Sequence, residues 1–192
     1  MSTDGAPAVA GSRRWVAFLR AVNVGDRAVP MVELTSLAEG LGLREVRTWL
    51  RSGNVVFRDG GRTSSSALER RLEVAAERQL GLTTEVLVRS AEELEEVLSS
   101  GPFPAFARAD PSHLLVVLLK APPRKERVLA LASSISGREE VRAGPRCLYA
   151  TYPEGIGRSR LTLSRIESAL GTRGTARNWN TLSRLVERTR EG

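Results

Sequence analysis

Short apolar runs and helical periodicities alternate along the chain, in an order that occurs twice. In the first half, β-branched and aromatic runs predict strands, and apolar residues three or four positions apart predict helices. The predicted order is strand, helix, strand, strand, helix, strand, helix. These elements cover Trp15 to Arg20, Pro30 to Leu41, Val46 to Arg51, Val55 to Arg58, Ala67 to Leu80, Glu85 to Arg89 and a last helix that follows Ser90.

The second half has the same predicted order, without obvious sequence identity to the first. Its strands and helices cover His113 to Lys120, Pro123 to Ser134, Glu139 to Ala143, Cys147 to Tyr152, Leu163 to Leu170, Arg173 to Arg177 and Thr181 to Thr189. The β-α-β-β-α-β part of each half is the split βαβ arrangement of ferredoxin-like domains. The sequence therefore predicts an α+β protein, a tandem pair of ferredoxin-like (βαββαβ) subdomains, each followed by an extra helix.

Local composition predicts where these parts begin and end. Residues 1–12 are small and polar, which is typical of a disordered tail. Residues 100–112 are rich in Pro, Gly and Ser, which indicates a linker. The first subdomain is then expected over residues 13–99, and the second, basic subdomain over residues 113–192.

The overall composition is that of an ordinary globular protein. Of the 192 residues, 41% are hydrophobic and 27% are charged. The longest apolar run, Leu114 to Leu119, has the length of a strand and is too short to cross a membrane. No membrane partner is therefore expected. The one cysteine, Cys147, cannot form an internal disulfide, so the cytoplasm is the expected location.

The charge is distributed unevenly between the halves. The net charge is +7. Residues 1–100 contain 13 basic and 14 acidic residues, whereas residues 101–192 contain 16 and 8. An asymmetry of this size suggests an anionic partner for the second half. A solvated surface rich in arginine explains the same counts equally well.

Two polar motifs of the first half are expected at one end of its sheet. In a ferredoxin-like unit, the loop after the first strand and the hairpin between the second and third strands emerge together. The residues that this topology gathers are Arg20, Asn23, Gly25, Arg51, Ser52 and Asn54. Each asparagine alone is equally typical of a turn. Arg20 and Arg51 follow buried strands and need a partner, for which Asp26, Glu33 and Glu45 are internal candidates.

The second half carries its polar motifs at the opposite end, in the loops that follow its third and fourth strands. Each loop leads into a helix N-terminus, where free backbone N–H groups and the helix dipole favour anions. We expect these residues to be neighbours: Gly155, Gly157, Arg158, Ser159, Arg160, Arg177, Asn178 and Asn180. Glycine lets a backbone approach a ligand closely. The competing interpretation is that the glycines only turn the chain, the asparagines cap helices and Trp179 packs internally.

The sequence offers little for catalysis. His113 is the only histidine, and it opens a strand away from Cys147. No Cys/His metal spacing and no Ser-His-Asp set occurs, so neither a metal nor a cofactor is expected. Glu154 and Asp26 are the only carboxylates beside the motifs that could act as a general base. The aromatic content of 5% argues against base stacking and leaves nucleic-acid binding through phosphates open.

Four motifs together carry a family resemblance: Arg20-x-x-Asn23-Val-Gly25, Val46-Arg-Thr-x-x-x-Ser52-Gly-Asn54-Val-Val-Phe57, Gly155-Ile-Gly-Arg-Ser159-x-Leu-Thr162 and Thr175-x-Arg-Asn-Trp-Asn-Thr181. In these motifs the chain closely resembles the bacterial family known as domain of unknown function 1697, from about Trp15 to Val186. Arg51 stands where relatives often carry Gln, and Arg160 where they often carry Lys. The resemblance implies a cytoplasmic bacterial protein with a two-part α+β fold, and it implies no reaction.

These observations lead to one expected function and two alternatives. We expect binding of a phosphorylated or otherwise anionic ligand, a nucleotide or a nucleic acid, in a cleft where both motif clusters meet. The first alternative is an enzyme that acts on a small phosphorylated substrate, with arginines stabilising transition-state charge. The second is a structural role, in which the motifs lock the two halves together. The sequence leaves the ligand, any catalysis and the oligomeric state open.

Overall fold

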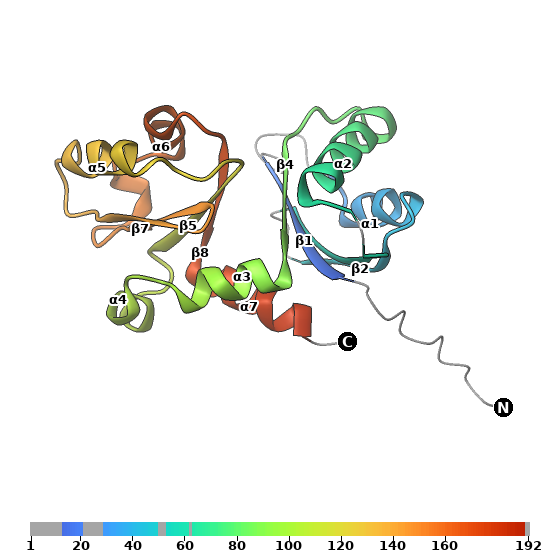
Figure 1. Cartoon of the computed structure of the whole chain (residues 1–192), viewed down its shortest axis with the longest axis horizontal. Coiled ribbons are helices and arrows are strands. Elements are labelled where there is room, and N and C mark those ends of the chain that lie inside the picture. Colours follow the sequence, from blue (N-terminus) through green and yellow to red (C-terminus); the bar gives the residue numbers. More distant parts are fainter. Residues whose placement is uncertain (1–12, 21–28, 50–52, 62, 191–192) are drawn as a thin grey trace. The chain divides into compact units, whose positions relative to one another are not determined.

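A computed structural model describes residues 13–20, 29–49, 53–61 and 63–190 (Figure 1). These residues contain seven α-helices and two four-stranded antiparallel sheets, which confirms the predicted α+β class. The chain divides into two compact units, Met1–Ala91 and Glu92–Gly192. The predicted tail, residues 1–12, lies outside the described residues.

The first unit consists of a sheet with two helices packed on one face. Its elements are β1 (Arg13–Leu19), α1 (Met31–Gly40), β2 (Arg44–Trp49), β3 (Asn54–Asp59), α2 (Ser65–Leu80) and β4 (Val86–Ser90). The strand order is β2-β3-β1-β4. Alternate residues of β1, Trp15, Ala17 and Leu19, face the helices and share a core with Leu34 of α1 and Leu68 of α2. This packing uses the alternation of a strand and the apolar stripe of each helix.

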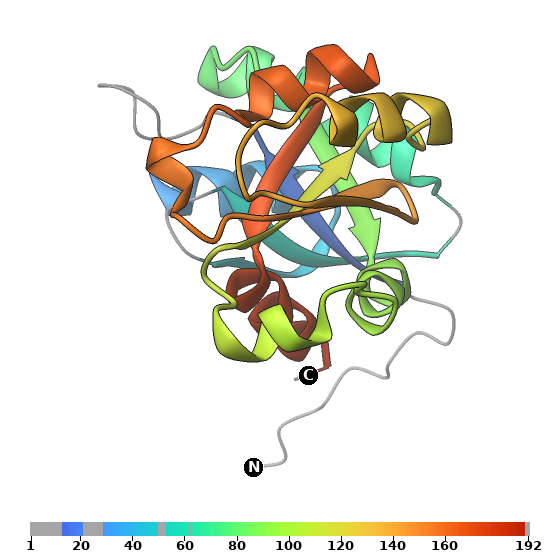
Figure 2. The same ribbon diagram turned by 90° about the vertical axis from the view of Figure 1, so that its left-hand side faces the viewer.

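The second unit contains more helices, and they cover both faces of its sheet (Figure 2). Its elements are α3 (Ala91–Ser99), α4 (Pro104–Ala109), β5 (Leu114–Leu119), α5 (Lys125–Ser133), β6 (Val141–Gly144), β7 (Cys147–Thr151), the 3-10 helix η1 (Ile156–Arg158), α6 (Leu163–Leu170), β8 (Gly174–Asn178) and α7 (Trp179–Arg190). The strand order, β6-β7-β5-β8, corresponds to that of the first unit. Helices α5 and α6 lie on one side of the sheet, and α3, α4 and α7 on the other.

Helix α3 belongs to the second unit and not to the first. The Tyr149 hydroxyl of β7 donates a hydrogen bond of 2.6 Å to the Val97 carbonyl of α3. Ion pairs add to it, at 3.4 Å between Arg146 and Glu93 and at 2.8 Å between Arg190 and Glu95. The division of the chain falls after Ala91, the first residue of this helix, whereas the sequence predicts it after residue 99. The expected linker, residues 100–112, also contains a helix, α4.

Carboxylates from the helices cap the outer edge of the last strand in each sheet. In the first unit, Glu73 and Glu69 of α2 accept hydrogen bonds from the backbone N–H groups of Val86 (2.8 Å) and Val88 (2.9 Å). In the second unit, Glu167 of α6 accepts one of 2.7 Å from Gly174. An uncapped edge strand offers its N–H groups to strands of other molecules. These carboxylates occupy such N–H groups at the edges formed by β4 and β8.

Backbone hydrogen bonds at matching places relate the two units. At the end of the first strand of each unit, one N–H group bonds to the hairpin and the next to the residue before the last strand. The pairs are Leu19 to Gly53 (2.9 Å) and Arg20 to Glu85 (3.0 Å) in the first unit, and Leu119 to Arg146 (2.9 Å) and Lys120 to Arg173 (2.9 Å) in the second. The two units therefore share this hydrogen-bond pattern although the residues differ.

Replacement of the edge-capping carboxylate of the second unit tests its contribution to stability. Glu167→Ala leaves the Gly174 N–H without this acceptor, so we expect the free energy of unfolding to fall by about 2 kcal/mol. Urea denaturation measures the change. Glu167→Gln keeps an acceptor oxygen and should retain most of the stability, and Glu187→Ala on exposed α7 surface should be neutral. Wild-type stability in Glu167→Ala would contradict the capping role.

Candidate functional site

The sequence motif at Gly155 to Thr162 lies beside a pocket of about 190 Å³ within the second unit. One wall is the loop between β7 and α6, and the other is the segment between α5 and β6. The polar side chains around it are Ser136, Glu139, Glu154, Arg158, Ser159, Arg160 and Arg165. Three arginines against two carboxylates give the pocket a net positive charge.

The β7–α6 loop is fixed at both of its ends. Gly155 has φ +89°, a left-handed backbone region that favours glycine, and its N–H bonds to the Tyr152 carbonyl at 3.0 Å. The Tyr152 hydroxyl donates to the Leu161 carbonyl at 2.9 Å, and burial raises the pKa of Tyr152 to about 12. Thr162 then caps α6 by accepting from the Arg165 N–H at 3.2 Å. The loop is thus held in a defined conformation.

Ser159 is bound on both sides within this loop. Its hydroxyl donates to the Glu139 carboxylate and accepts from the Leu161 N–H at 2.9 Å. The hydrogen bond from Ser159 lowers the pKa of Glu139, since it stabilises the charged form of the carboxylate. Ser159 therefore ties the β7–α6 loop to the segment that precedes β6.

The arginines of the pocket differ in how they are held. Arg165 donates to the Ser134 carbonyl at 2.6 Å, which fixes its guanidinium beside the end of α5. Arg158 and Arg160 are exposed and have no hydrogen bond or ion pair with any residue that the structure describes. Glu154 is also exposed, with Arg138 at 4.0 Å. Two cationic side chains on a fixed loop are therefore available to an anion.

Five predicted residues of this half do not line the pocket, namely Gly155, Gly157, Arg177, Asn178 and Asn180. Ala176 of β8 packs into the core under α5 and α6, so the next residue, Arg177, points from the opposite face of the sheet. There Arg177 donates to the Thr175 hydroxyl at 2.8 Å, and burial lowers its pKa to about 10. The two loops leave the same end of the sheet as predicted, but the alternation of β8 separates Arg177 from Arg158.

Asn178, Trp179 and Asn180 have structural contacts within the second unit. Asn178 caps α7, because its side-chain oxygen accepts from the Thr181 N–H at 2.9 Å. Asn180 donates to the Ser112 hydroxyl at 3.2 Å. Trp179 packs on Gly101, where a Cβ atom would lie 2.5 Å from the indole ring. These contacts match the competing interpretation of helix capping and internal packing.

Only Arg20 and Asn54 of the first-half cluster lie within the described residues. Arg20 forms an ion pair of 3.2 Å with Glu85. The sequence suggested Glu33 or Glu45 as its partner, and neither of these carboxylates pairs with it. Glu45 instead contacts Arg58 at 2.7 Å. Asn54 is buried in the β2–β3 hairpin and donates to the Trp49 carbonyl at 3.0 Å. The predicted residues Asn23, Gly25, Arg51 and Ser52, and the candidate partner and base Asp26, lie outside the described part of the chain.

Three polar residues of the pocket were not among the sequence candidates, namely Ser136, Glu139 and Arg165. Glu139 was assigned to a strand, and Arg165 to the α6 helix. Their roles depend on the approach of the α5–β6 segment to the β7–α6 loop, which no local pattern predicts. The sequence shows only that Arg165 follows the helix cap Thr162 by three residues.

No group of three or more His, Cys, Asp and Glu side chains is placed to hold a metal ion within the part of the chain that the structure describes. None of the helices in that part has the length and apolar character needed to cross a membrane.

The fold and the motifs define a two-unit α+β protein, and comparison with known proteins gives its family. Residues 13–149 match the model of the family described as protein of unknown function (DUF1697), and the chain belongs to that family. The matched residues include the first pair of motifs, while the pocket loop follows them. No curated protein matches the chain.

A solved structure has a similar fold. It is the conserved bacterial protein SP0830 from Streptococcus pneumoniae, with a TM-score of 0.75 and 21% sequence identity. The similarity covers 94% of this chain and 99% of the other. At this identity the likeness concerns the fold alone.

The α7 cap gives a direct test of the structural role of Asn178. Asn178→Ala removes the acceptor for the Thr181 N–H, so we expect a loss of about 1 kcal/mol in unfolding free energy. Asn178→Asp keeps an oxygen in place and should retain wild-type stability. Thermal unfolding of the two variants provides the comparison, and equal melting temperatures would argue against capping.

The buried Tyr152 hydroxyl predicts a loss of stability at high pH. Its pKa is raised to about 12, so between pH 10 and 12 the folded state keeps a proton that the unfolded state releases. The free energy of unfolding therefore falls as the pH rises through this window. In Tyr152→Phe the slope of the unfolding free energy against pH should be less steep, by the equivalent of about one proton. Urea denaturation at several pH values measures this slope. An unchanged slope would contradict the assignment.

Proposed function

We propose that the second unit binds a phosphorylated small molecule or a similar anion in the pocket between the β7–α6 loop and the α5–β6 segment. The observation that carries this proposal is the pair of exposed arginines, Arg158 and Arg160, on either side of the fixed Ser159, which have no partner among the described residues. Guanidinium groups bind phosphate oxygens through paired, charge-assisted hydrogen bonds. The pocket volume of about 190 Å³ suits a phosphate group better than a whole nucleotide.

Neither of the two glycines of the loop lines the pocket itself. Gly155 is required by its backbone angle. Gly157 has an ordinary angle, and a Cβ atom there would meet nothing within 4 Å. The glycines therefore shape and expose the loop, and the proposal rests on Arg158 and Arg160.

The same geometry supports binding more than turnover. A general base works best with a pKa near the working pH, whereas the hydrogen bond from Ser159 lowers the pKa of Glu139. Ser159 is engaged by Glu139 and by the Leu161 N–H, so its hydroxyl is committed to the loop. We therefore keep enzymatic action on a phosphorylated substrate as the alternative.

Two broader inferences accompany this proposal. We infer that both units are ferredoxin-like repeats, which the equivalent strand orders support. We also infer a cytoplasmic location, which the single buried cysteine, Cys147, supports. The expected meeting of the two motif clusters in one cleft stays a prediction.

Calorimetric titration tests the proposal with inorganic phosphate, mononucleotides and sugar phosphates. Wild type should bind at least one of these compounds saturably. Arg158→Ala/Arg160→Ala should weaken that binding at least about tenfold, because each lost charge-assisted contact is worth about 1.5 kcal/mol or more. Arg184→Ala, an exposed arginine on α7, is the matched control and should bind as wild type does.

Gly157→Ala provides a second variant for the same titration. It should leave both the melting temperature and the binding unchanged, since Gly157 does not line the pocket and a Cβ atom there would meet nothing within 4 Å. Absence of binding to all three probe classes would refute the small-ligand proposal. Short oligonucleotides are titrated as a fourth probe, and binding to them alone, with affinity that falls steeply as salt rises, would assign the arginines to nucleic-acid phosphates.

A further inference from the structure

Helix α2 of the first unit separates its charges between two faces. Glu69 and Glu73 lie on the face toward β4, where they cap backbone N–H groups. Arg70 and Arg78 lie on another face, eight residues apart, with Val74 midway between them. Residues four apart share one side of a helix, so these three form a basic-apolar-basic stripe.

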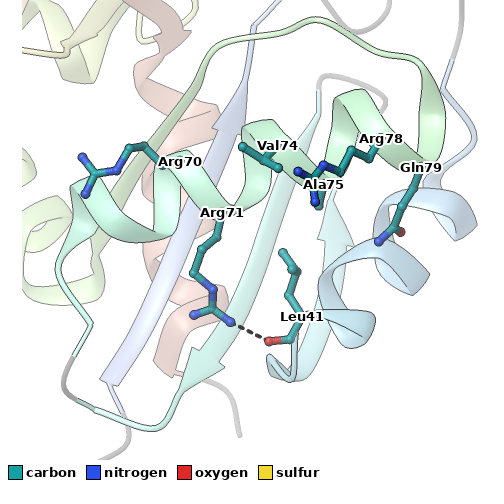
Figure 3. A pocket seen from close by; sticks show the side chains of 7 residues that line it. All are labelled: Leu41, Arg70, Arg71, Val74, Ala75, Arg78 and Gln79. Carbon is teal, nitrogen blue, oxygen red and sulfur yellow. Dashed lines mark hydrogen bonds between the residues drawn. The ribbon is translucent and has the colours of Figure 1, made fainter.

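A groove of about 390 Å³ follows this stripe (Figure 3). It is lined by Leu41, which follows the last residue of α1, and by the α2 residues Arg70, Arg71, Val74, Ala75, Arg78 and Gln79. Val74 is 47% exposed, although large apolar side chains on a helix usually pack inward. The groove thus combines an apolar floor with a rim of three arginines.

The rim arginines are held differently. Arg71 reaches across to α1 and donates to the Leu41 carbonyl at 2.6 Å, which joins the two helices along the groove (Figure 3). Arg70 and Arg78 are exposed and have neither an ion pair nor a hydrogen bond among the residues that the structure covers. No acidic residue lines the groove. Arg71 also forms an ion pair of 3.9 Å with Asp59 outside the groove, so among the described residues the charges left without a counter-charge are those of Arg70 and Arg78.

The spacing along α2 restricts the occupant. Each residue of a helix rises about 1.5 Å, so Arg70 and Arg78 lie about 12 Å apart along the axis, with Val74 about 6 Å from each. A ligand with one anionic group can engage only one end of this stripe. The complementary occupant has two anionic groups at the same spacing and an apolar group between them.

We propose that this groove docks an acidic amphipathic helix of a protein partner, through acidic, apolar and acidic residues at positions i, i+4 and i+8. Such a helix laid along α2 repeats the spacing of Arg70, Val74 and Arg78 with complementary charge. The apolar residue contacts Val74 and Ala75, and the two carboxylates contact the arginines. The site is distinct from the anion pocket, since all of its residues belong to the first unit.

The experiment uses the full chain and a fluorescein-labelled helical peptide of about 16 residues, rich in alanine and with Glu, Leu and Glu at four-residue intervals. Fluorescence anisotropy should show saturable binding to wild type. Arg70→Glu/Arg78→Glu should weaken it at least about tenfold, and Val74→Asp should also weaken it. A peptide with Lys in place of Glu should bind the charge-reversed variant better than it binds wild type. All substituted positions are exposed, so the fold should survive, and thermal unfolding checks this.

Matched controls separate docking from general attraction to a basic protein. Arg44→Glu/Arg47→Glu changes the net charge equally at exposed positions of β2 and should bind as wild type does. A peptide of the same composition with scrambled spacing should bind at least about tenfold more weakly. Equal loss in both double variants, or equal binding of the scrambled peptide, would overturn the proposal.

Other occupants give distinct results in the same assays. Failure of the wild type to bind the peptide would overturn the proposal. The proposal would also be overturned if the wild type bound hexyl phosphate and not the peptide, and if Val74→Asp abolished this binding. The groove would then hold a small amphiphile. Self-association in sedimentation that Arg70→Glu/Arg78→Glu abolishes would assign the groove to a second copy of this chain, and would also overturn it.

Discussion

Each unit depends on carboxylates placed at the edge of its sheet. An antiparallel sheet of four strands leaves backbone N–H groups unpaired along its outer strands. Glu69 and Glu73 in the first unit and Glu167 in the second meet such groups on the last strand. The same contact fixes the helix against the sheet, since the carboxylate is part of that helix. This one interaction therefore sets both the sheet edge and the position of α2 or α6.

The fixed position of α6 in turn determines the anion pocket. The cap Thr162 and the anchor Tyr152 hold the β7–α6 loop between the sheet and α6, and Ser159 connects it to Glu139. Only Arg158 and Arg160 of this loop remain without a partner among the described residues. In the first unit, α2 uses one face for the sheet edge and leaves its arginines on another. In both units, the helix that caps the edge also carries or borders arginines that have no partner within the described part of the chain.

Local signals in the sequence predicted the elements well. Helix α6 has the predicted bounds, Leu163–Leu170, because Thr162 begins it and Gly171 ends it in a left-handed conformation. The capping role of Asn178 was also recognisable, since asparagine before a helix is a common cap. The topological argument correctly placed the β1 end beside the β2–β3 hairpin, as the bond from Leu19 to Gly53 requires.

Long-range contacts were beyond such signals. The assignment of α3 to the second unit depends on Tyr149 and Val97, which are distant in sequence. The partner of Arg20 is Glu85, because strand pairing brings β4 beside β1. Arg177 was grouped with Arg158 because both follow the same sheet end, whereas strand alternation places Arg177 on the other face.

Trp179 carries a practical consequence for spectroscopy. Since its indole packs on Gly101 and does not line the anion pocket, its emission reports the docking of the α3–α4 turn on α7. An unchanged tryptophan spectrum is therefore compatible with a fully occupied pocket.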